Sequence, residues 1–496
     1  NYNTVVGDEA GTAITTGDDN TSVGYKAGYT LTTGTNNILI GGNAGDAITT
    51  GSENVALGRA SLSSDTLGNS SVAIGHQALF TQNFTSTTSS HNVAVGKNAG
   101  LSVTTGVQNT LIGALAGDAL TDADYNVAVG KGALSADTLG SRAVAIGKNA
   151  LQVQNFTSAT DNYNVAMGYH AGQNITTGIN NTLIGGLAGD AITDADYNVA
   201  LGYSSLTTNQ LGSKSTAIGT FSLNNQNPAS ATDMFNTAVG YAAGGVITTG
   251  VRNTFVGSLA GDGTDDGNEN VAVGESALSA NCGSGNTAVG REALKVVTGA
   301  YNTSVGYQTG DNITGGNYNI LVGAGCVPSG ASAEVQIVMG ANATGVANGN
   351  FTIGNGATDS NLVLGATTWT APSDSRMKED VATSTAGISF VNDLRPVTYK
   401  WKKEKDLPDS MDAYVEGSEK RVINDKTNHG FIAQEVKSAI DAHPEIKDGF
   451  DMWMEKDSDG QQRVAPSALV PVLTKAIQEL SAQVEALTAR IETLEG

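Results

Sequence analysis

Aromatic, charged and cysteine residues are all scarce in this chain of 496 residues. Aromatic residues make up 5% of it and charged residues 15%, whereas glycine occurs 63 times. So few large side chains argue against a series of ordinary globular domains with deep hydrophobic cores. The 2 cysteines cannot form a disulfide framework. No run of about 18 apolar residues is present, so we expect no membrane insertion.

Positive charge is also in short supply, because the net charge is −22. Binding nucleic acid through its phosphates needs stripes of Lys and Arg, so we expect no nucleic-acid partner. The 5 histidines are scattered and indicate no zinc site. Residues 41–45 are glycine-rich but lack the Lys-Ser/Thr of a phosphate loop, and the oxygen-rich residues 262–269 lack EF-hand spacing. We therefore expect neither a cofactor nor a bound metal.

Composition changes abruptly near residue 372. Residues 1–372 contain 35 charged residues, whereas the much shorter 373–496 contains 39, and glycine falls from 57 to 6. All three Trp lie at or beyond this junction. We therefore predict two domains, 1–372 and 373–496.

The first domain is a tandem repeat. The motif Asn-x-Ala-aliphatic-Gly occurs, for example, at residues 54–58, 92–96 and 198–202. Its glycine recurs in 22 copies from Gly7 to Gly365, mostly at intervals of 17 in the sequence numbering, with longer intervals of 21 at regular places. Three intervals of 17 and one of 21 make a super-repeat of 72, which indicates that a four-coil unit was duplicated.

Each repeat has the pattern of a short β-strand followed by a turn. Of the three residues before the glycine, the middle one is usually Ala, a small residue, and the two on either side of it are mostly aliphatic or β-branched. This alternation is typical of a short strand. Glycine then permits a turn that a Cβ would strain. The asparagine can hydrogen-bond its own backbone at a corner, or form a ladder with the asparagine of the next coil. One coil of ~17 residues cannot bury a face alone. We therefore predict a mainly β fold, a β-solenoid or β-roll rod of about 22 stacked coils, roughly 100 Å long at ~4.8 Å per coil.

The repeat resembles the head repeat of trimeric autotransporter adhesins, a left-handed parallel β-roll, and similar repeats in phage tail fibres. The resemblance covers about residues 1–365 and concerns architecture, since the repeated residues serve stacking. It implies a homotrimeric rod in which part of the apolar strand face is buried between chains. The adhesin coil is shorter than the coil of this chain, so we expect each coil here to carry an extra outward loop.

Residues 373–496 have the pattern of a small α+β domain that ends in a coiled coil. Residues 397–401 suggest a strand, and Ala433 to Ala442 shows helical spacing. Apolar residues recur in alternating steps of four and three over residues 473–494, which is a heptad seam. β-branched residues at one seam position and Leu at the other favour two strands by themselves. We nevertheless expect three, because the rod is expected to be trimeric.

This domain contains four ordered blocks, Ser373-Asp374-Ser375-Arg376-Met377-Lys378, residues 394–399, residues 430–436 and residues 469–480. Together they resemble the self-cleaving intramolecular chaperone domain that ends endosialidase tailspikes and many phage tail fibres. The resemblance covers essentially all of 373–496. It implies a C-terminal trimeric chaperone that assembles the fibre and then cuts itself off.

The resemblance also implies a cleavage site and its chemistry. The family cuts directly before the motif serine, here between Pro372 and Ser373, with a Ser–Lys dyad that corresponds to Ser373 and Lys378. The other matched residues, implied to position the dyad or to hold the subunit interface, are Asp374, Arg376, His429, Gln434 and Glu435. Self-cleavage by a serine peptidase mechanism is thus the expected enzyme activity, with no action on other substrates.

The implied dyad is chemically coherent. A serine hydroxyl needs a base, and a lysine can serve only when burial or nearby charge lowers its pKa from ~10.4. Ser373 could attack the carbonyl carbon before it, and water would complete the cut. Without the family, the same six residues are typical of a helix N-cap with a polar first turn.

We expect a virion tail-fibre protein that attaches to the host surface through a glycan or protein receptor, after assembly in the host cytoplasm. Because Asn1 falls inside a repeat, we expect an upstream segment that joins other tail proteins. One alternative is a tailspike depolymerase that degrades host polysaccharide, although short coils with few aromatics offer little room for two carboxylates and a sugar. The other is a bacterial trimeric surface adhesin, which fits the repeats but not the chaperone-like ending.

Overall fold

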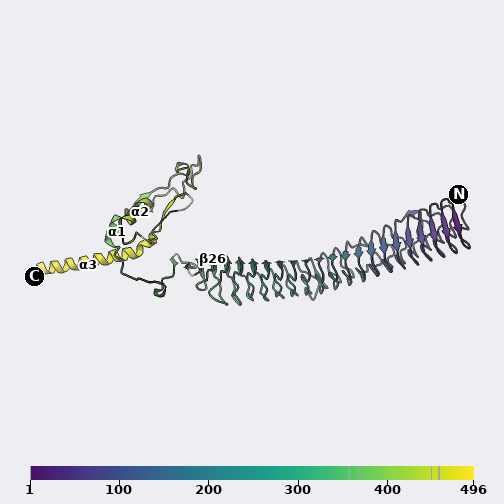
Figure 1. Ribbon diagram of the computed structural model, residues 1–496, viewed down its shortest axis with the longest axis horizontal. Coiled ribbons are helices and arrows are strands. Elements are labelled where there is room, and N and C mark those ends of the chain that lie inside the picture. The colour runs from purple at the N-terminus through teal and green to yellow at the C-terminus, as the bar shows by residue number, and fades with distance from the viewer. Residues whose placement is uncertain (1, 357, 367, 448, 456–458, 496) are drawn as a thin grey trace. The chain divides into compact units, whose positions relative to one another are not determined.

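The computed structural model describes residues 2–356, 358–366, 368–447, 449–455 and 459–495. The chain divides into two compact units, Asn1–Pro372 and Ser373–Gly496. The first unit is a stack of β-coils, and the labelled helices belong to the second (Figure 1).

The first unit is the predicted β-solenoid. Its strands form one 23-stranded sheet, in which the last two strands are antiparallel and the other 21 are parallel. The parallel strands are β1 (Thr4–Val6), β2 (Thr21–Val23), β3 (Ile38–Ile40), β4 (Val55–Leu57), β6 (Val72–Ile74), β8 (Val93–Val95), β9 (Thr110–Ile112), β10 (Val127–Val129), β12 (Val144–Ile146), β14 (Val165–Met167), β15 (Thr182–Ile184), β16 (Val199–Leu201), β18 (Thr216–Ile218), β20 (Thr237–Val239), β21 (Thr254–Val256), β22 (Val271–Val273), β23 (Thr287–Val289), β24 (Thr303–Val305), β25 (Ile320–Val322), β26 (Ile337–Ala341) and β27 (Asn350–Asn355).

The strands stack in register, each residue against its equivalent in the next coil. In β3 and β4, for example, Leu39 pairs with Ala56. In the three-residue strands of the solenoid after β1, the middle residue points inward. The small Ala that usually occupies it is fully buried, as are the larger Leu111 and Phe255. These side chains form one thin, continuous core along the unit.

The asparagines form the predicted ladder between coils. The Oδ1 atom of Asn20 accepts hydrogen bonds from both the backbone N–H and the side-chain amide of Asn37, each at 3.0 Å. The same amide of Asn37 also donates to the Gly51 carbonyl oxygen at 2.9 Å. Because these asparagines are buried from Asn20 onward, this pattern satisfies polar groups that could not reach water.

The motif glycine is required by both conformation and space. Gly58 has a φ of 144°, which side chains rarely tolerate. A Cβ at this position would lie 2.5 Å from the carbonyl oxygen of Gly75 in the next coil. The close approach of successive coils therefore depends on glycine at this corner.

The longer intervals of the repeat build additional short parallel strand pairs on the solenoid. These are β5 (Gly68–Asn69) with β7 (Thr88–Ser89), β11 (Gly140–Ser141) with β13 (Thr160–Asp161), and β17 (Gly212–Ser213) with β19 (Thr232–Asp233).

A buried polar group recurs beside each of these strand pairs. In the first, the Asp65 carboxylate accepts hydrogen bonds from the Gln82 side-chain amide at 2.7 Å and from the Gly68 N–H at 2.9 Å. Asp137 occupies the same place one super-repeat later, and Asn209 replaces it in the third. Burial raises the pKa of the Asp65 and Asp137 carboxyl groups.

The solenoid ends one coil earlier than predicted. After β27 the chain reverses into β28 (Thr358–Val363), which is antiparallel to β27, and then into β29 (Trp369–Thr370). Gly365 follows β28 and has open space around its Cα, so it is not the corner of a stacked coil. The prediction of a twenty-second coil there was therefore wrong, because an Asn-x-x-aliphatic-Gly-like stretch also suits a hairpin strand.

The second unit is a small α+β domain that ends in a long helix. Its elements are the 3-10 helix η1 (Ser375–Met377), α1 (Ile388–Asp393), β30 (Val397–Tyr399), η2 (Glu404–Asp406), β31 (Asn428–Gly430), α2 (Ala433–Ala442), β32 (Trp453–Glu455), β33 (Gln462–Val464), η3 (Pro466–Ala468) and α3 (Leu469–Glu495). The helix predicted from Ala433 to Ala442 is confirmed at both ends.

The core of this unit lies where α1, α2 and the start of α3 meet. Phe390 and Met452 are fully buried, and Val436, Ile440 and Val472 pack with them. Farther along α3 the seam residues are exposed, for example Ile477 at 67% and Leu487 at 59%. The seam is therefore an apolar helix face that this single chain leaves uncovered.

Candidate functional site

The first residues of the second unit bring a serine and a lysine together. Ser373 closely precedes the one-turn helix η1, and Lys378 follows it. The turn folds the chain back so that Lys378 Nζ lies 2.7 Å from Ser373 Oγ, within hydrogen-bonding distance. Both side chains are exposed in the single chain. Lys378 Nζ is the donor of this hydrogen bond, and the spacing is the one that a nucleophile and its base require.

The residues between them hold this turn in place. Asp374 is the N-cap of η1, and its Oδ1 accepts a hydrogen bond from the backbone N–H of Arg376 at 2.8 Å. The guanidinium of Arg376 also pairs with the Asp374 carboxylate through Nε at 3.0 Å and Nη2 at 2.5 Å. Hydrogen bonds from Arg376 lower the pKa of Asp374. These two residues thus have a local positioning role, and the N-cap expected from the six residues alone is also present.

The remaining predicted site residues lie elsewhere in the second unit. His429 is exposed in β31, where it pairs with Thr398 of β30, and Gln434 is exposed in the first turn of α2. Glu435 pairs with the Arg395 guanidinium, whose hydrogen bonds lower the pKa of the Glu435 carboxyl. Among the described residues, none of the three makes a hydrogen bond or ion pair with Ser373 or Lys378.

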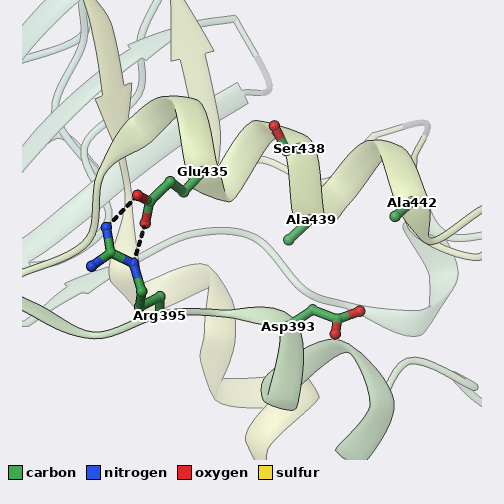
Figure 2. A pocket seen from close by; sticks show the side chains of 6 residues that line it. All are labelled: Asp393, Arg395, Glu435, Ser438, Ala439 and Ala442. Carbon is green, nitrogen blue, oxygen red and sulfur yellow. Dashed lines mark hydrogen bonds and ion pairs between the residues drawn. The ribbon is translucent and has the colours of Figure 1, made fainter.

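A cavity of about 430 Å³ adjoins the Arg395–Glu435 pair (Figure 2). Glu435, Ser438, Ala439 and Ala442 of α2 line one wall, while Asp393 and Arg395 line the other. In Figure 2 the ion pair closes one end of the hollow, and Asp393 lies near the other. The site is open, and its lining carries two carboxylates, Asp393 and Glu435, and one guanidinium, Arg395.

A buried histidine that the sequence did not single out stands beside Asp393. His443 directly follows α2, with Nε2 2.8 Å from Asp393 Oδ2 and Nδ1 2.9 Å from Glu445 Oε1. Hydrogen bonding to Asp393, and then to Glu445, raises the pKa of His443. Glu445 is close to His443 in the sequence, but Asp393 lies 50 residues before it, so no spacing signal marks the three as a cluster.

The described part of the chain contains no group of three or more His, Cys, Asp or Glu placed to hold a metal ion. In the oxygen-rich 262–269 loop, Asp265 Oδ1 and Asn268 Oδ1 accept hydrogen bonds from Thr248 and Val251. Cys282 and Cys326 are buried free thiols. No described helix is both long and apolar enough to cross a membrane.

Comparison with protein families identifies the start of the second unit. Residues 373–443 match the family described as "Chaperone of endosialidase". The match begins at Ser373 and covers the first three of the four blocks noted in the sequence, while residues 469–480 lie beyond it. Searches of curated proteins and of solved structures found no match. The matched domain and the solenoid together fit a protein of the tail-fibre or endosialidase type, with a chaperone of endosialidase domain in its C-terminal unit.

Proposed function

We propose that this chain is the subunit of a homotrimeric phage tail fibre that attaches the virion to the host surface. Its C-terminal unit guides trimer assembly and then cuts itself off between Pro372 and Ser373. The observation that carries the proposal is the Ser373–Lys378 hydrogen bond at 2.7 Å, placed at the first residue of the matched chaperone domain.

The cut proceeds by an acyl shift followed by hydrolysis. Lys378, as a neutral amine, takes the proton of Ser373 Oγ while that oxygen attacks the carbonyl carbon of Pro372. The Pro372–Ser373 C–N bond breaks, the departing nitrogen takes up the proton, and an ester joins the Pro372 carbonyl to Ser373 Oγ. Water then hydrolyses the ester to a Pro372 carboxylic acid, and restores the Ser373 hydroxyl on a new amino terminus.

The exposure of the dyad supports a link between cleavage and assembly. A lysine in water is charged and cannot accept a proton, whereas burial disfavours the charged form. Packing of three chains over the exposed Ser373 and Lys378 would therefore switch the base on. Cleavage then follows assembly rather than preceding it.

The outer face of the solenoid supports self-association. The first and third residues of the three-residue strands point outward, and most are aliphatic or β-branched, such as Val55 and Leu57 in β4. We call these two columns the aliphatic stripe. Many of its third-position residues are more than a third exposed, among them Leu57, Met167 and Leu201 at 41–43%. A soluble monomer rarely shows so long an apolar surface, and a second copy with the same repeat covers it over its full length.

The C-terminal helix supports the same assembly. The exposed seam of α3 continues into a groove of about 300 Å³ between α1 and α3, lined by Ile388, Val391, Leu473, Ile477 and Leu480 among others. Seam positions of this kind pack as knobs into holes of a partner helix. Three copies of α3 would bury the seam and hold the C-terminal units together.

Denaturing gels of the full chain test the cleavage. Wild type is expected to give two pieces, while Ser373→Ala and Lys378→Ala leave one chain of 50.4 kDa. Lys378→Arg keeps the positive charge but removes the base, so it is also expected to stay intact. Clean cleavage in the Lys378 variants would exclude the dyad.

Light scattering of the Ser373→Ala variant tests the assembly, because the uncut chain keeps its chaperone. A mass of three chains is expected, and a monomer would overturn the proposed trimer. Incubation of the trimer with host polysaccharide tests the depolymerase alternative. New reducing ends would support a depolymerase, whereas binding without them supports attachment.

A further inference from the structure

Aromatic side chains flank the aliphatic stripe on both sides, at the same level of the solenoid. The two flanking places are the fifth residue before the motif glycine and the first residue after it, which we call the edge positions. In four coils both edge positions are aromatic. These couples are Tyr163 with Tyr169, Tyr197 with Tyr203, Phe235 with Tyr241, and Tyr301 with Tyr307. All eight rings are about half exposed, between 48% and 54%.

Within one chain these rings contact neighbours along the solenoid and not across it. Phe221 lies edge-on to Tyr203 at 5.7 Å and to Tyr241 at 6.1 Å between ring centroids. Tyr301 stacks on Tyr318 of the next coil at 5.1 Å. Among the described residues, no ring contact joins the two members of any couple. The strand separates them, and each couple presents one ring on either side of the stripe.

A closed ring of three copies brings the two edges together. Around a threefold axis that runs along the solenoid, each contact is heterologous, so one edge of a subunit meets the opposite edge of the next. Suppose that equivalent coils of the three chains lie at the same height along the axis. The ring after the motif glycine of one subunit then meets the ring before the motif glycine in the same coil of the next subunit. Tyr and Phe are also enriched in protein interfaces relative to the rest of the surface.

Charged edge positions agree with this pairing. Glu53 is coupled with Arg59, and Tyr125 with Lys131, which gives an opposite-charge pair and a cation–π pair across the boundary.

Two couples carry like charges, but a partner within the chain offsets a charge in each. In the couple of Arg142 with Lys148, Asp161 binds Arg142 at 2.9 Å. In the couple of Glu269 with Glu275, Arg291 binds Glu275 at 3.2 Å. Charge repulsion at these two couples therefore does not prevent equivalent coils of the three chains from lying at the same height along the axis.

We propose that the aromatic edge couples pair across the three subunit boundaries and fix the axial register of the fibre. The inference rests on the trimer proposed above and adds the residues that align it. Identical coils could otherwise slide past one another, because the aliphatic stripe looks much the same at every level. The aromatic couples are unevenly placed along the solenoid, so only one alignment matches all of them.

Cross-linking of the full chain tests the pairing. The variant Tyr197→Cys with Tyr203→Cys, treated with a short bis-maleimide, is expected to run as a covalent trimer on a denaturing gel. Each single variant is expected to give no covalent trimer, since its thiols do not meet around the ring. The native Cys282 and Cys326 are 2% and 0% exposed, so the background is measured with wild type.

A mismatched pair tests the register. Tyr163→Cys with Tyr241→Cys places the same number of thiols four coils apart, about 19 Å along the axis at ~4.8 Å per coil. It is expected to give little covalent trimer, and equal cross-linking would show that equivalent coils do not lie at the same height along the axis. Should Tyr197→Cys with Tyr203→Cys fail to assemble, Phe235→Cys with Tyr241→Cys provides the same test.

Light scattering and cross-linking together distinguish a failure of the edge pairing from a failure of the proposed trimer. A trimer by light scattering without cross-linking at either matched couple overturns the edge pairing but leaves the trimer intact. The aromatic columns would then face solvent, as platforms for sugar rings must. A monomer by light scattering would overturn the trimer and the pairing together.

Discussion

The carboxylate of Glu479 in α3 accepts a hydrogen bond from the backbone N–H of Ile388, the first residue of α1, at 2.9 Å. Gly387 precedes α1 and provides no side-chain cap. Glu479 therefore supplies from another helix the acceptor that the first turn lacks. A Cβ at position 387 would lie 2.3 Å from this carboxylate, so a larger residue there would require the Glu479 side chain to move. The contact ties the start of the domain to its long terminal helix.

We expect Glu479→Ala to weaken α1 by about 1 kcal/mol, the usual effect of losing a helix cap. Amide hydrogen exchange of residues 388–393 should become faster in the full chain. Glu492→Ala is the matched control, because Glu492 is exposed farther along the same helix. Equal loss of protection in both variants would show that charge on α3, and not the cap, stabilises α1.

Gly58→Ala should destabilise the solenoid by about 1–3 kcal/mol, because alanine strains the left-handed backbone and its Cβ meets the next coil. Gly42→Ala is the control, since a Cβ there finds no atom within 4 Å. Thermal unfolding followed by circular dichroism compares them. A lower unfolding midpoint for Gly58→Ala alone is expected, and matching midpoints would contradict the close-approach argument.

Replacing the buried Asp65 and Asp137 by Asn should stabilise the solenoid at neutral pH. Burial raises the pKa of both carboxyl groups, so their ionisation disfavours the folded state. Stability of the wild type is then greatest below the ordinary value of 3.8 and declines as the pH rises through the raised pKa. Asn209, at the equivalent position, already makes the corresponding bond to Gly212.

Thermal unfolding at several pH values between 4 and 8 provides the measurement. The midpoint of the double variant should fall less with rising pH than the midpoint of wild type. The corresponding difference in the free energy of unfolding should be on the order of 1 kcal/mol per site at neutral pH. Asp122→Asn, at an exposed loop position, serves as the control. A double variant with the wild-type pH dependence would refute the assignment.

His443 should stabilise the C-terminal unit in its protonated form. Its pKa is raised, first by Asp393 and then by Glu445, so its contribution is complete below the ordinary value of 6.5 and is lost as the pH rises through the higher pKa. We expect His443→Asn to remove this part of the pH dependence of urea-induced unfolding. Tryptophan fluorescence reports it, because Trp401 and Trp453 both lie in this unit. His91→Asn, in the solenoid, should leave the pH dependence unchanged.

The regular part of the fold could be predicted because one residue type has one physical role in every coil. Gly58 and its equivalents occupy corners that exclude a Cβ, and the stacked asparagines satisfy one another, so the period appears directly in the sequence. The helix from Ala433 to Ala442 was equally visible, because its apolar spacing matches its buried face. Local rules were sufficient in both cases.

What the sequence did not reveal depends on contacts between distant residues. Nothing near Gly365 distinguishes a stacked coil from the hairpin strand β28, since the choice is made by pairing with β27. Asp393 meets His443 only after α1 and α2 pack together, since the two residues are 50 apart in the sequence. The proximity of Ser373 to Lys378 was implied by resemblance, and the turn η1 that produces it has no strong pattern of its own.

The in-register stacking of equivalent residues also bears on how such a protein changes over generations. Because every coil presents the same face to the coil above and below, removing or inserting a whole four-coil module leaves both new junctions chemically equivalent to the old ones. Recombination between modules can therefore lengthen or shorten the shaft in fixed increments while its two ends stay unaltered. The length of the solenoid can then vary in discrete steps of one four-coil module.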